Sequence, residues 1–304
     1  MRVKDKYLNP FTDFGFKKLF GVEPNKDILI DFLNELLRKD EGKIQEIIYL
    51  SPEQLGRTSG DRKAIFDLYC ENERGEKFIV EMQKAKQNYF KDRSIYYSTF
   101  PIQSQAHKGG WGFELNSVYT VGILDFVFDE DRGDDQVFHH EVQLFDKSTQ
   151  AVFYDKLTYI YLELPKFTKT LDELETHFDN WLYVLKHLEH LTARPTKLRE
   201  SIFTKLFEQA EIANIDDEEY REYEESLKTY RDLKNSIDTA RGEGEEKGRR
   251  EGREEGKREG KEEGRREGKK EAEIAIAGNL KRQHVPSEII SRSTGLGIEE
   301  IEKL

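Results

Sequence analysis

The stretch that decides the fold is KAIFDLYCENERGEKFIVEMQ, residues 63–83. Residues 64–72 and 77–83 are rich in apolar and aromatic side chains and flank the turn sequence ERGE, which is typical of two β-strands. A three-residue loop at positions 73–75 fits this spacing, because Gly75 can take the left-handed conformation that such loops favour. The stretch therefore predicts an antiparallel β-hairpin.

The loop length sets the register of this hairpin. Counting outward from Asn72 opposite Glu76 pairs Asp67 with Glu81. One face is then wholly apolar, and a slip of one residue would scatter its side chains over both faces. Its pairs are Phe66 with Met82, Leu68 with Val80, and Cys70 with Phe78; Cys70, the only cysteine, is expected to be a small buried filler. The other face presents Asp67, Glu81 and Gln83 beside Ile65, Tyr69 and Ile79.

The polar face places two carboxylates side by side. At the Cβ separation of roughly 5 Å between cross-strand neighbours, Asp67 and Glu81 repel each other unless a positive charge intervenes. A divalent cation such as Mg²⁺ prefers such hard oxygen ligands, and it can activate water for attack on a phosphate. Gln83 lies on the same face and can orient that water or the phosphate. A plain hydrated sheet face is the alternative, since this spacing alone is not specific.

The flanking segments predict a mixed α/β architecture. Residues 25–39 have the apolar spacing of an amphipathic helix, and residues 86–107 predict a longer polar and aromatic helix. Helices around a central sheet make a layered α/β sandwich. The other expected elements are a second strand pair at 117–128 and 136–145 joined by the acidic loop 129–135, a strand at 155–164 ending before Pro165, and helices over 170–238.

The order of several motifs resembles one protein family. These are TDFGFKKLFG at residues 12–21, the Asp and Glu-x-Gln hairpin, an aromatic and basic helix with Arg93, Tyr96 and Tyr97, LELPKF at 162–167, and the closing TGLGIEEIEKL. On these residues the chain resembles the PD-(D/E)XK nuclease superfamily and, within it, the recombination-promoting nuclease (Rpn) and transposase family of bacteria. The resemblance covers essentially the full length. It implies a restriction-endonuclease-like core, a central mixed sheet flanked by helices, with a helical C-terminal extension.

The resemblance also implies roles for individual residues. Asp67 and Glu81 would bind Mg²⁺ or Mn²⁺, and Gln83 stands where the superfamily has a lysine. Glutamine brings only neutral hydrogen bonds, so turnover is expected to be slow or lost. Glu35, on the first amphipathic helix, would be the helix-borne acid that completes the metal site, with Asp31 and Glu41 as alternatives.

The distribution of charge bears on DNA binding. The net charge of −12 counts against phosphate contacts, although a local patch or a bound metal can reverse the field where it matters. Four basic residues follow the hairpin closely: Lys84, Lys86, Lys91 and Arg93. They predict a local DNA-binding patch, with Arg93 the strongest candidate because it matches the family. For the lysines a purely solubilising role is the alternative.

The C-terminal region differs in composition from the rest. Over residues 241–271 a glycine recurs every four positions from Gly244 to Gly268, among 12 basic and 11 acidic residues. We interpret it either as a solvated, partly helical linker or as a helix whose glycine stripe packs against a second copy to form a homo-oligomer. Residues 272–304 predict a small helical unit like a helix-turn-helix or an oligomerisation piece, with Ser287 as a cap. The nuclease-like domain is expected over residues 1–240.

Further features narrow the class of protein. No apolar run approaches the roughly 18 residues that span a membrane, and the N-terminus lacks an apolar signal core, so a cytoplasmic protein without membrane contact is expected. Glu141-Val142-Gln143 repeats the Glu-x-Gln pattern but is interpreted as a solvent-facing edge. The leading hypothesis is a Mg²⁺-dependent DNA endonuclease linked to recombination or mobile elements. The alternative is a catalytically weak or inactive DNA-binding or oligomeric interaction protein that retains the fold.

Overall fold

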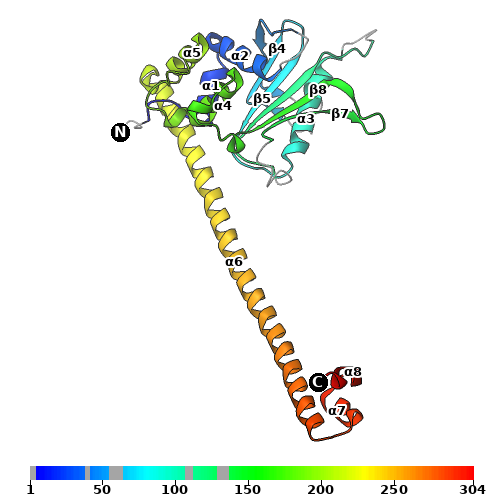
Figure 1. Cartoon of the computed structure of the whole chain (residues 1–304). Coiled ribbons are helices and arrows are strands. Elements are labelled where there is room, and N and C mark those ends of the chain that lie inside the picture. Colours follow the sequence, from blue (N-terminus) through cyan, green and yellow to red (C-terminus); the bar gives the residue numbers. More distant parts are fainter. Residues whose placement is uncertain (1–4, 38–41, 55–63, 107–111, 129–136) are drawn as a thin grey trace. The chain divides into compact units, whose positions relative to one another are not determined.

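The computed structural model describes residues 5–37, 42–54, 64–106, 112–128 and 137–304. Its centre is a six-stranded sheet in the order β1-β4-β5-β6-β8-β7, with helices on both faces (Figure 1). β5, β6 and β8 run parallel, and the other neighbours pair antiparallel. The mixed sheet expected from the sequence is confirmed. Its strands are β1 (Ile47–Tyr49), β4 (Leu68–Asn72), β5 (Lys77–Gln83), β6 (Val118–Leu124), β7 (His139–Asp146) and β8 (Ala151–Glu163); β2 (Glu53–Gln54) and β3 (Ala64–Ile65) form a separate pair.

The β4–β5 hairpin has the predicted register. Leu68 lies opposite Val80, and Cys70 lies opposite Phe78. The loop closes when Asn72 donates its N–H to the Glu76 carbonyl at 3.0 Å, and Gly75 has φ +78°. Glycine is required there because this left-handed region is strained for a residue with a Cβ. Cys70 is fully buried, as expected.

The chain is irregular just before β4, and here one expectation is wrong. Phe66 donates its N–H to the Pro52 carbonyl oxygen at 3.0 Å, and the chain bends at Asp67. Phe66 consequently packs against Tyr69 on one face of the sheet, whereas Met82 lies in the core on the other face. The expected apolar pair of Phe66 with Met82 does not form, because the break in the pleat shifts the side-chain alternation by one residue.

The expected pairing of the two strands that follow is also wrong. β6 and β7 are not neighbours, since β8 lies between them. β7 and β8 are joined by a short turn and pair antiparallel, whereas β6 is parallel to both β5 and β8. Parallel strands need a crossover, which α3 (Phe90–Ser104) provides between β5 and β6. The acidic loop 129–135 lies outside the described residues.

The main hydrophobic core lies between one sheet face and a group of helices. Trp181, fully buried, packs there against Phe20 and Phe32, with ring centroids 6.0 and 5.3 Å away. At the start of α1, residue 15 has to be glycine, because a Cβ there would lie 2.1 Å from the Asn9 carbonyl oxygen. The helices are α1 (Asp13–Phe20), α2 (Lys26–Leu36), α4 (His177–His187), α5 (Ser201–Ala210) and the first turns of α6 (Asp217–Arg282).

The second face of the sheet is covered by α3. Tyr97 and Phe100 of this helix pack with Phe66, and Phe90 packs with Tyr161 of β8. The helix spans Phe90–Ser104 and is therefore shorter than the range 86–107 expected from the sequence. A loop connects the end of β5 to the start of α3.

An ion-pair cluster joins α2 to α4. The His177 ring lies 2.6 Å from Asp31 and 2.8 Å from Glu200, and Trp181 donates its indole N–H to Asp31 at 2.8 Å. Burial disfavours a charged imidazole, but the hydrogen bonds and charges of Asp31 and Glu200 outweigh it and raise the pKa of His177. Asp31 is therefore engaged in holding two helices together.

Replacing His177 by Gln is expected to destabilise the protein in acid more than in base. A histidine with a raised folded-state pKa contributes stability that is complete below its unfolded pKa of about 6.5 and is lost as the pH rises through the folded value. We expect a loss of about 1 kcal/mol near pH 5.5 and almost none near pH 9, measured by urea unfolding. Burial lowers the pKa of His187 on the same helix, so His187→Gln should show the opposite pH dependence; equal losses at both pH values for His177→Gln would contradict the assignment.

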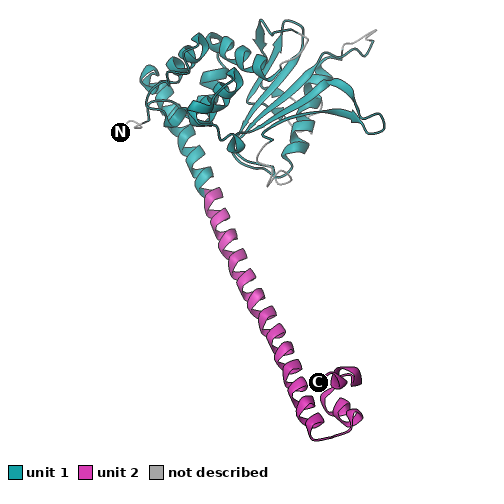
Figure 2. Cartoon of the chain, viewed as in Figure 1, with its two compact units in different colours: residues 1–235 teal, residues 236–304 magenta. Residues whose placement is uncertain are grey.

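The chain forms two compact units, residues 1–235 and 236–304 (Figure 2). The second unit contains most of α6, then α7 (Ser287–Thr294) and α8 (Ile298–Glu302). Its small core consists of Ala277, Ile290, Leu296 and Ile301. Pro286 occupies the N-cap of α7, so Ser287 is the first helical residue and not the cap that was expected.

The glycine-periodic segment is helical along its whole length within α6. Ion pairs four residues apart, such as Arg241 with Glu245 at 2.9 Å, lie along it on the exposed surface. A Cβ on any glycine from Gly244 to Gly268 would meet no atom of the described residues within 4 Å. The homo-oligomer expected from this stripe stays a prediction. Among the helices that the structure describes, none combines the length and apolar character needed to cross a membrane.

Candidate active site

Asp67 and Glu81 meet at the open end of the hairpin, where their side chains replace ladder hydrogen bonds. Asp67 Oδ2 accepts the backbone N–H of Met82 at 2.8 Å. In return the backbone N–H of Asp67 is directed at Glu81 Oε1, 3.3 Å away. The bend at Asp67 makes this exchange possible, because it turns the side chain toward the edge of β5. The two acids are thus held together, but not as the predicted cross-strand pair, because the ladder begins at Leu68.

The environment of this pair disfavours negative charge. Burial and, second, the charge of Asp67 raise the pKa of Glu81 to about 8, although Arg93 acts in the opposite direction. Burial also raises the pKa of Asp67, while the Met82 N–H lowers it. Glu81 is only 8% exposed. Buried Glu81 and half-buried Asp67 repel each other, so this is a site where a bound cation would stabilise both anions.

The donor set fits a hydrated divalent cation. Within the described ranges no group of three or more His, Cys, Asp or Glu side chains is placed to hold a metal, so Asp67 and Glu81 form a two-carboxylate site. Mg²⁺ commonly keeps several waters and is held by one or two carboxylates together with substrate phosphates. The pair therefore suits Mg²⁺ or Mn²⁺ bound with a substrate and does not suit a closed all-protein cage.

Arg93 orients Gln83 beside the acidic pair. Its Nη2 donates to Gln83 Oε1 at 2.6 Å, and Gln83 Nε2 donates to the Ala85 carbonyl oxygen at 3.0 Å. Both polar ends of the buried Gln83 amide are therefore fixed. The guanidinium also lies 5.7 Å from the centre of the Tyr97 ring, on the next turn of α3. Arg93 thus brings to the site a fixed positive charge, which Gln83 itself lacks.

The three lysines of the expected DNA-binding patch lie in different places. Lys84 is half-buried near Asp67 and Asp13; burial lowers its pKa, and the two carboxylates oppose this effect. Lys86 and Lys91 are exposed and line a separate pocket at the start of α3. Arg93, the fourth basic residue, donates a hydrogen bond to Gln83, a candidate catalytic residue. The patch is therefore divided between the acidic pair and that pocket.

The helix-borne acid whose charge acts on Asp67 is Asp13 of α1, which the sequence reasoning did not assign. Its charge raises the pKa of Asp67, and its neighbour on the same helix, Lys17, lowers it. Asp13 and Lys17 are paired at 3.0 Å and both belong to the stretch TDFGFKKLFG. The available signal was their spacing of four residues, which places both on one helix face.

The expected role of Glu35 as the helix-borne acid stays a prediction. Glu35 follows Asn34 on α2 and precedes Leu36, and both neighbours line a cavity with Arg74 at the turn end of the hairpin. Of the two alternatives, Asp31 is bound to His177 and Trp181, and Glu41 lies outside the described residues.

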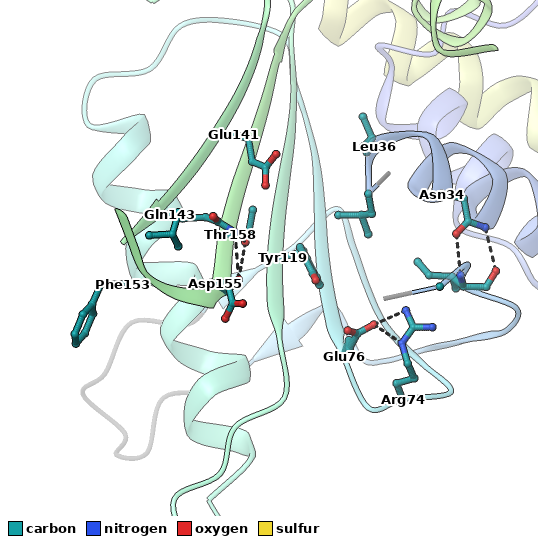
Figure 3. Close-up of a pocket in the computed structure, with 14 residues that line it drawn as sticks. Asn34, Leu36, Arg74, Glu76, Tyr119, Glu141, Gln143, Phe153, Asp155 and Thr158 are labelled. Carbon is teal, nitrogen blue, oxygen red and sulfur yellow. Dashed lines mark hydrogen bonds and ion pairs between the residues drawn. The ribbon is translucent and has the colours of Figure 1, made fainter. Parts of the chain in front are cut away.

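The second Glu-x-Gln pattern lines that same cavity of about 330 Å³ (Figure 3). Glu141 and Gln143 enter it from β7, and Gln143 donates to Thr158 at 2.9 Å. Arg74 and Glu76 in its wall are joined at 2.7 Å. The polar groups are thus largely paired with one another, which suits a structural cavity.

Architecture and site together define a class: a mixed sheet whose central hairpin ends in an acidic pair is the PD-(D/E)XK nuclease type. The family described as PD-(D/E)XK nuclease family transposase matches residues 10–240, which include the whole sheet and the acidic pair. The chain belongs to this family. No curated protein and no solved structure matches it.

Proposed function

We propose that the chain is a Mg²⁺- or Mn²⁺-dependent DNA endonuclease associated with recombination or mobile elements. The observation that carries this proposal is the pair of half-buried Asp67 and buried Glu81, joined through the backbone N–H groups of Asp67 and Met82 in a domain of the PD-(D/E)XK nuclease family. Membership of the family supports a nuclease. The dependence on a divalent metal and the internal cleavage of DNA are the proposed additions, and the cytoplasmic location stays a prediction.

Each site residue has a proposed task. Asp67 and Glu81 would hold the cation, which when bound would lower the pKa of a water molecule and stabilise charge on the phosphate. Gln83, fixed by Arg93, would orient the water or a phosphate oxygen, and Arg93 would supply the charge that a lysine gives elsewhere in the superfamily. We propose that Asp13, in place of Glu35, is the helix-borne acid and that it acts on the cation through Asp67, which its charge reaches. Lys84 would approach the DNA backbone beside it.

A second function keeps the fold without efficient cleavage. Gln83 in the place of a lysine favours a DNA-binding or interaction protein with weak or absent turnover, because glutamine brings only neutral hydrogen bonds. Its expected behaviour differs from that of the endonuclease, because such a protein would shift the mobility of DNA and leave the DNA intact.

Supercoiled plasmid incubated with the purified full-length protein separates the two functions. With Mg²⁺ or Mn²⁺ the endonuclease should produce nicked and then linear plasmid, and EDTA should stop the reaction because the cation is removed. The products are quantified on agarose gels over time. If the plasmid stays intact and only its mobility is retarded under all conditions, the endonuclease proposal is wrong and the DNA-binding function is supported.

A further inference from the structure

A pocket of about 430 Å³ lies beside the candidate active site, in the segment between β5 and α3. Aromatic rings form its inner wall, where Phe126 lies 5.9 Å from Phe90 and 5.8 Å from Phe128 in edge-to-face arrangements. Its rim carries Lys86 and Lys91 and the exposed amide side chains of Gln87 and Asn88. We call this the aromatic pocket.

Tyr89 is the most exposed aromatic residue of the aromatic pocket. Its side chain is 79% exposed, and its backbone has φ +62° directly before α3 begins. A bulky residue in the left-handed region is strained, and such outliers concentrate at ligand-binding and catalytic sites. The strained turn thus presents a large aromatic ring to solvent, and this ring adds little to the packing of the core.

Hydrogen bonds connect the aromatic pocket to Gln83, the candidate site residue next to the acidic pair. Arg93 donates from Nη1 to Gln87 in the pocket rim and from Nη2 to Gln83, the latter at 2.6 Å. Gln83 is two residues from Glu81 on the same strand. A nucleotide held in the pocket would therefore lie next to the phosphate that the acidic pair acts on.

The inner wall of the aromatic pocket is held in place from behind. The backbone N–H of Phe128 donates to Glu163, a fully buried carboxylate paired with Lys166 at 2.7 Å. The Lys91 amine lies 4.4 Å from the centre of the Phe128 ring. The pocket is consequently preformed, with positive charge next to its aromatic surface.

We propose that the aromatic pocket receives an unpaired nucleobase, so that the preferred substrate is DNA with unpaired nucleotides beside the cleaved bond. This rests on the proposed function, in which DNA is the substrate. Aromatic side chains stack on any base, lysines meet the phosphates, and amides can bond the exposed edge of the base. Inside a duplex the faces of a base are covered by its neighbours, so only an unstacked base can enter such a pocket.

Binding measured without cleavage tests this proposal. Fluorescence anisotropy in EDTA compares the full-length protein on a duplex, on the same duplex with a short central bulge, and on a bulge whose nucleotides lack bases. We expect the bulged duplex to bind most tightly and the abasic bulge to lose that advantage. Tyr89→Ala should weaken binding to the bulged duplex about 10-fold, since stacking contributes roughly 1–3 kcal/mol per base, and should leave duplex binding within about 2-fold.

Two control variants keep the interpretation specific. Tyr89→Phe retains the ring and should bind like the wild type. Tyr96→Ala removes a tyrosine that is 42% exposed on the same helix but outside the aromatic pocket, and it should change neither affinity by more than about 2-fold. Circular dichroism confirms that each variant is folded.

The outcomes separate this inference from the proposed function. Equal affinity for all three DNA forms, or equal losses for Tyr89→Ala on duplex and bulge, would overturn the pocket assignment even in a protein that cuts DNA. Preference for the bulge without cleavage in Mg²⁺ or Mn²⁺ would support the pocket and overturn the endonuclease. No binding to any form would overturn both.

Discussion

Replacing Asp67 by Asn is expected to lower the rate of Mg²⁺-dependent plasmid cleavage about a thousandfold. Losing one of two carboxylates removes several kcal/mol of charge stabilisation by the cation, and about 4 kcal/mol corresponds to three orders of magnitude in rate. Asn keeps the shape and can still accept the Met82 N–H that Asp67 Oδ2 binds at 2.8 Å. The rate is measured as the appearance of nicked plasmid at saturating Mg²⁺.

The same substitution should not destabilise the metal-free protein. Asp67 and Glu81 repel each other in a buried place, so a neutral side chain at position 67 relieves that repulsion. Loss of activity with an unchanged or higher melting temperature in EDTA is therefore the expected combination. A variant that loses its fold as well as its activity would not support a catalytic role for Asp67. Glu81→Gln, which removes the other acid, provides the second test.

Matched controls come from acids in similar local settings. Glu141→Gln changes the acid of the second Glu-x-Gln, which lines the cavity of Figure 3, and should keep the wild-type rate. Asp13→Asn should lower the rate about 10-fold, as is typical for groups that act through a metal ligand, whereas Glu35→Gln should leave it unchanged. A thousandfold lower cleavage rate in Glu141→Gln, or a wild-type rate in Asp67→Asn, would contradict the proposal that the hairpin acids bind the metal.

The hairpin could be predicted from the sequence because its signals are local. The alternation of side chains, the loop glycine at position 75 and the apolar set that includes Leu68 and Val80 all act within twenty residues. The same signals placed Asp67 next to Glu81. The central mixed sheet followed from the family resemblance, and the match over residues 10–240 confirms the family.

The features that could not be predicted depend on contacts between distant segments. Phe66 leaves the apolar face because its N–H bonds to Pro52, and no strand period contains that information. β8 enters the sheet between β6 and β7 because parallel pairing joins strands far apart in sequence. Asp13 comes near Asp67 through the packing of α1, and the aromatic pocket combines the start of α3 with the end of β6.

Replacing Lys166 by Met is expected to lower the free energy of unfolding more than His177→Gln or Lys205→Met does. Glu163 and Lys166 have side chains that are 0% and 2% exposed, and their charged atoms lie 2.7 Å apart. Lys166 also donates to the Val137 carbonyl oxygen at 3.0 Å. Removing the amine leaves a carboxylate buried without its main counter-charge, which typically costs about 3–5 kcal/mol.

Denaturant unfolding of the double variant distinguishes this cause from a simple loss of packing. With Glu163→Gln added to Lys166→Met, no charge of the pair remains buried, and the side-chain amide introduced at position 163 would still accept the Phe128 N–H that Glu163 accepts now. The double variant should therefore recover more than about 1 kcal/mol relative to Lys166→Met alone. Lys205→Met, which breaks a surface pair with Asp27 at 2.6 Å, should cost no more than about 1 kcal/mol. If the two losses at positions 163 and 166 simply add, the lysine does not act by balancing the charge of Glu163, and the wall of the aromatic pocket is not held by that ion pair.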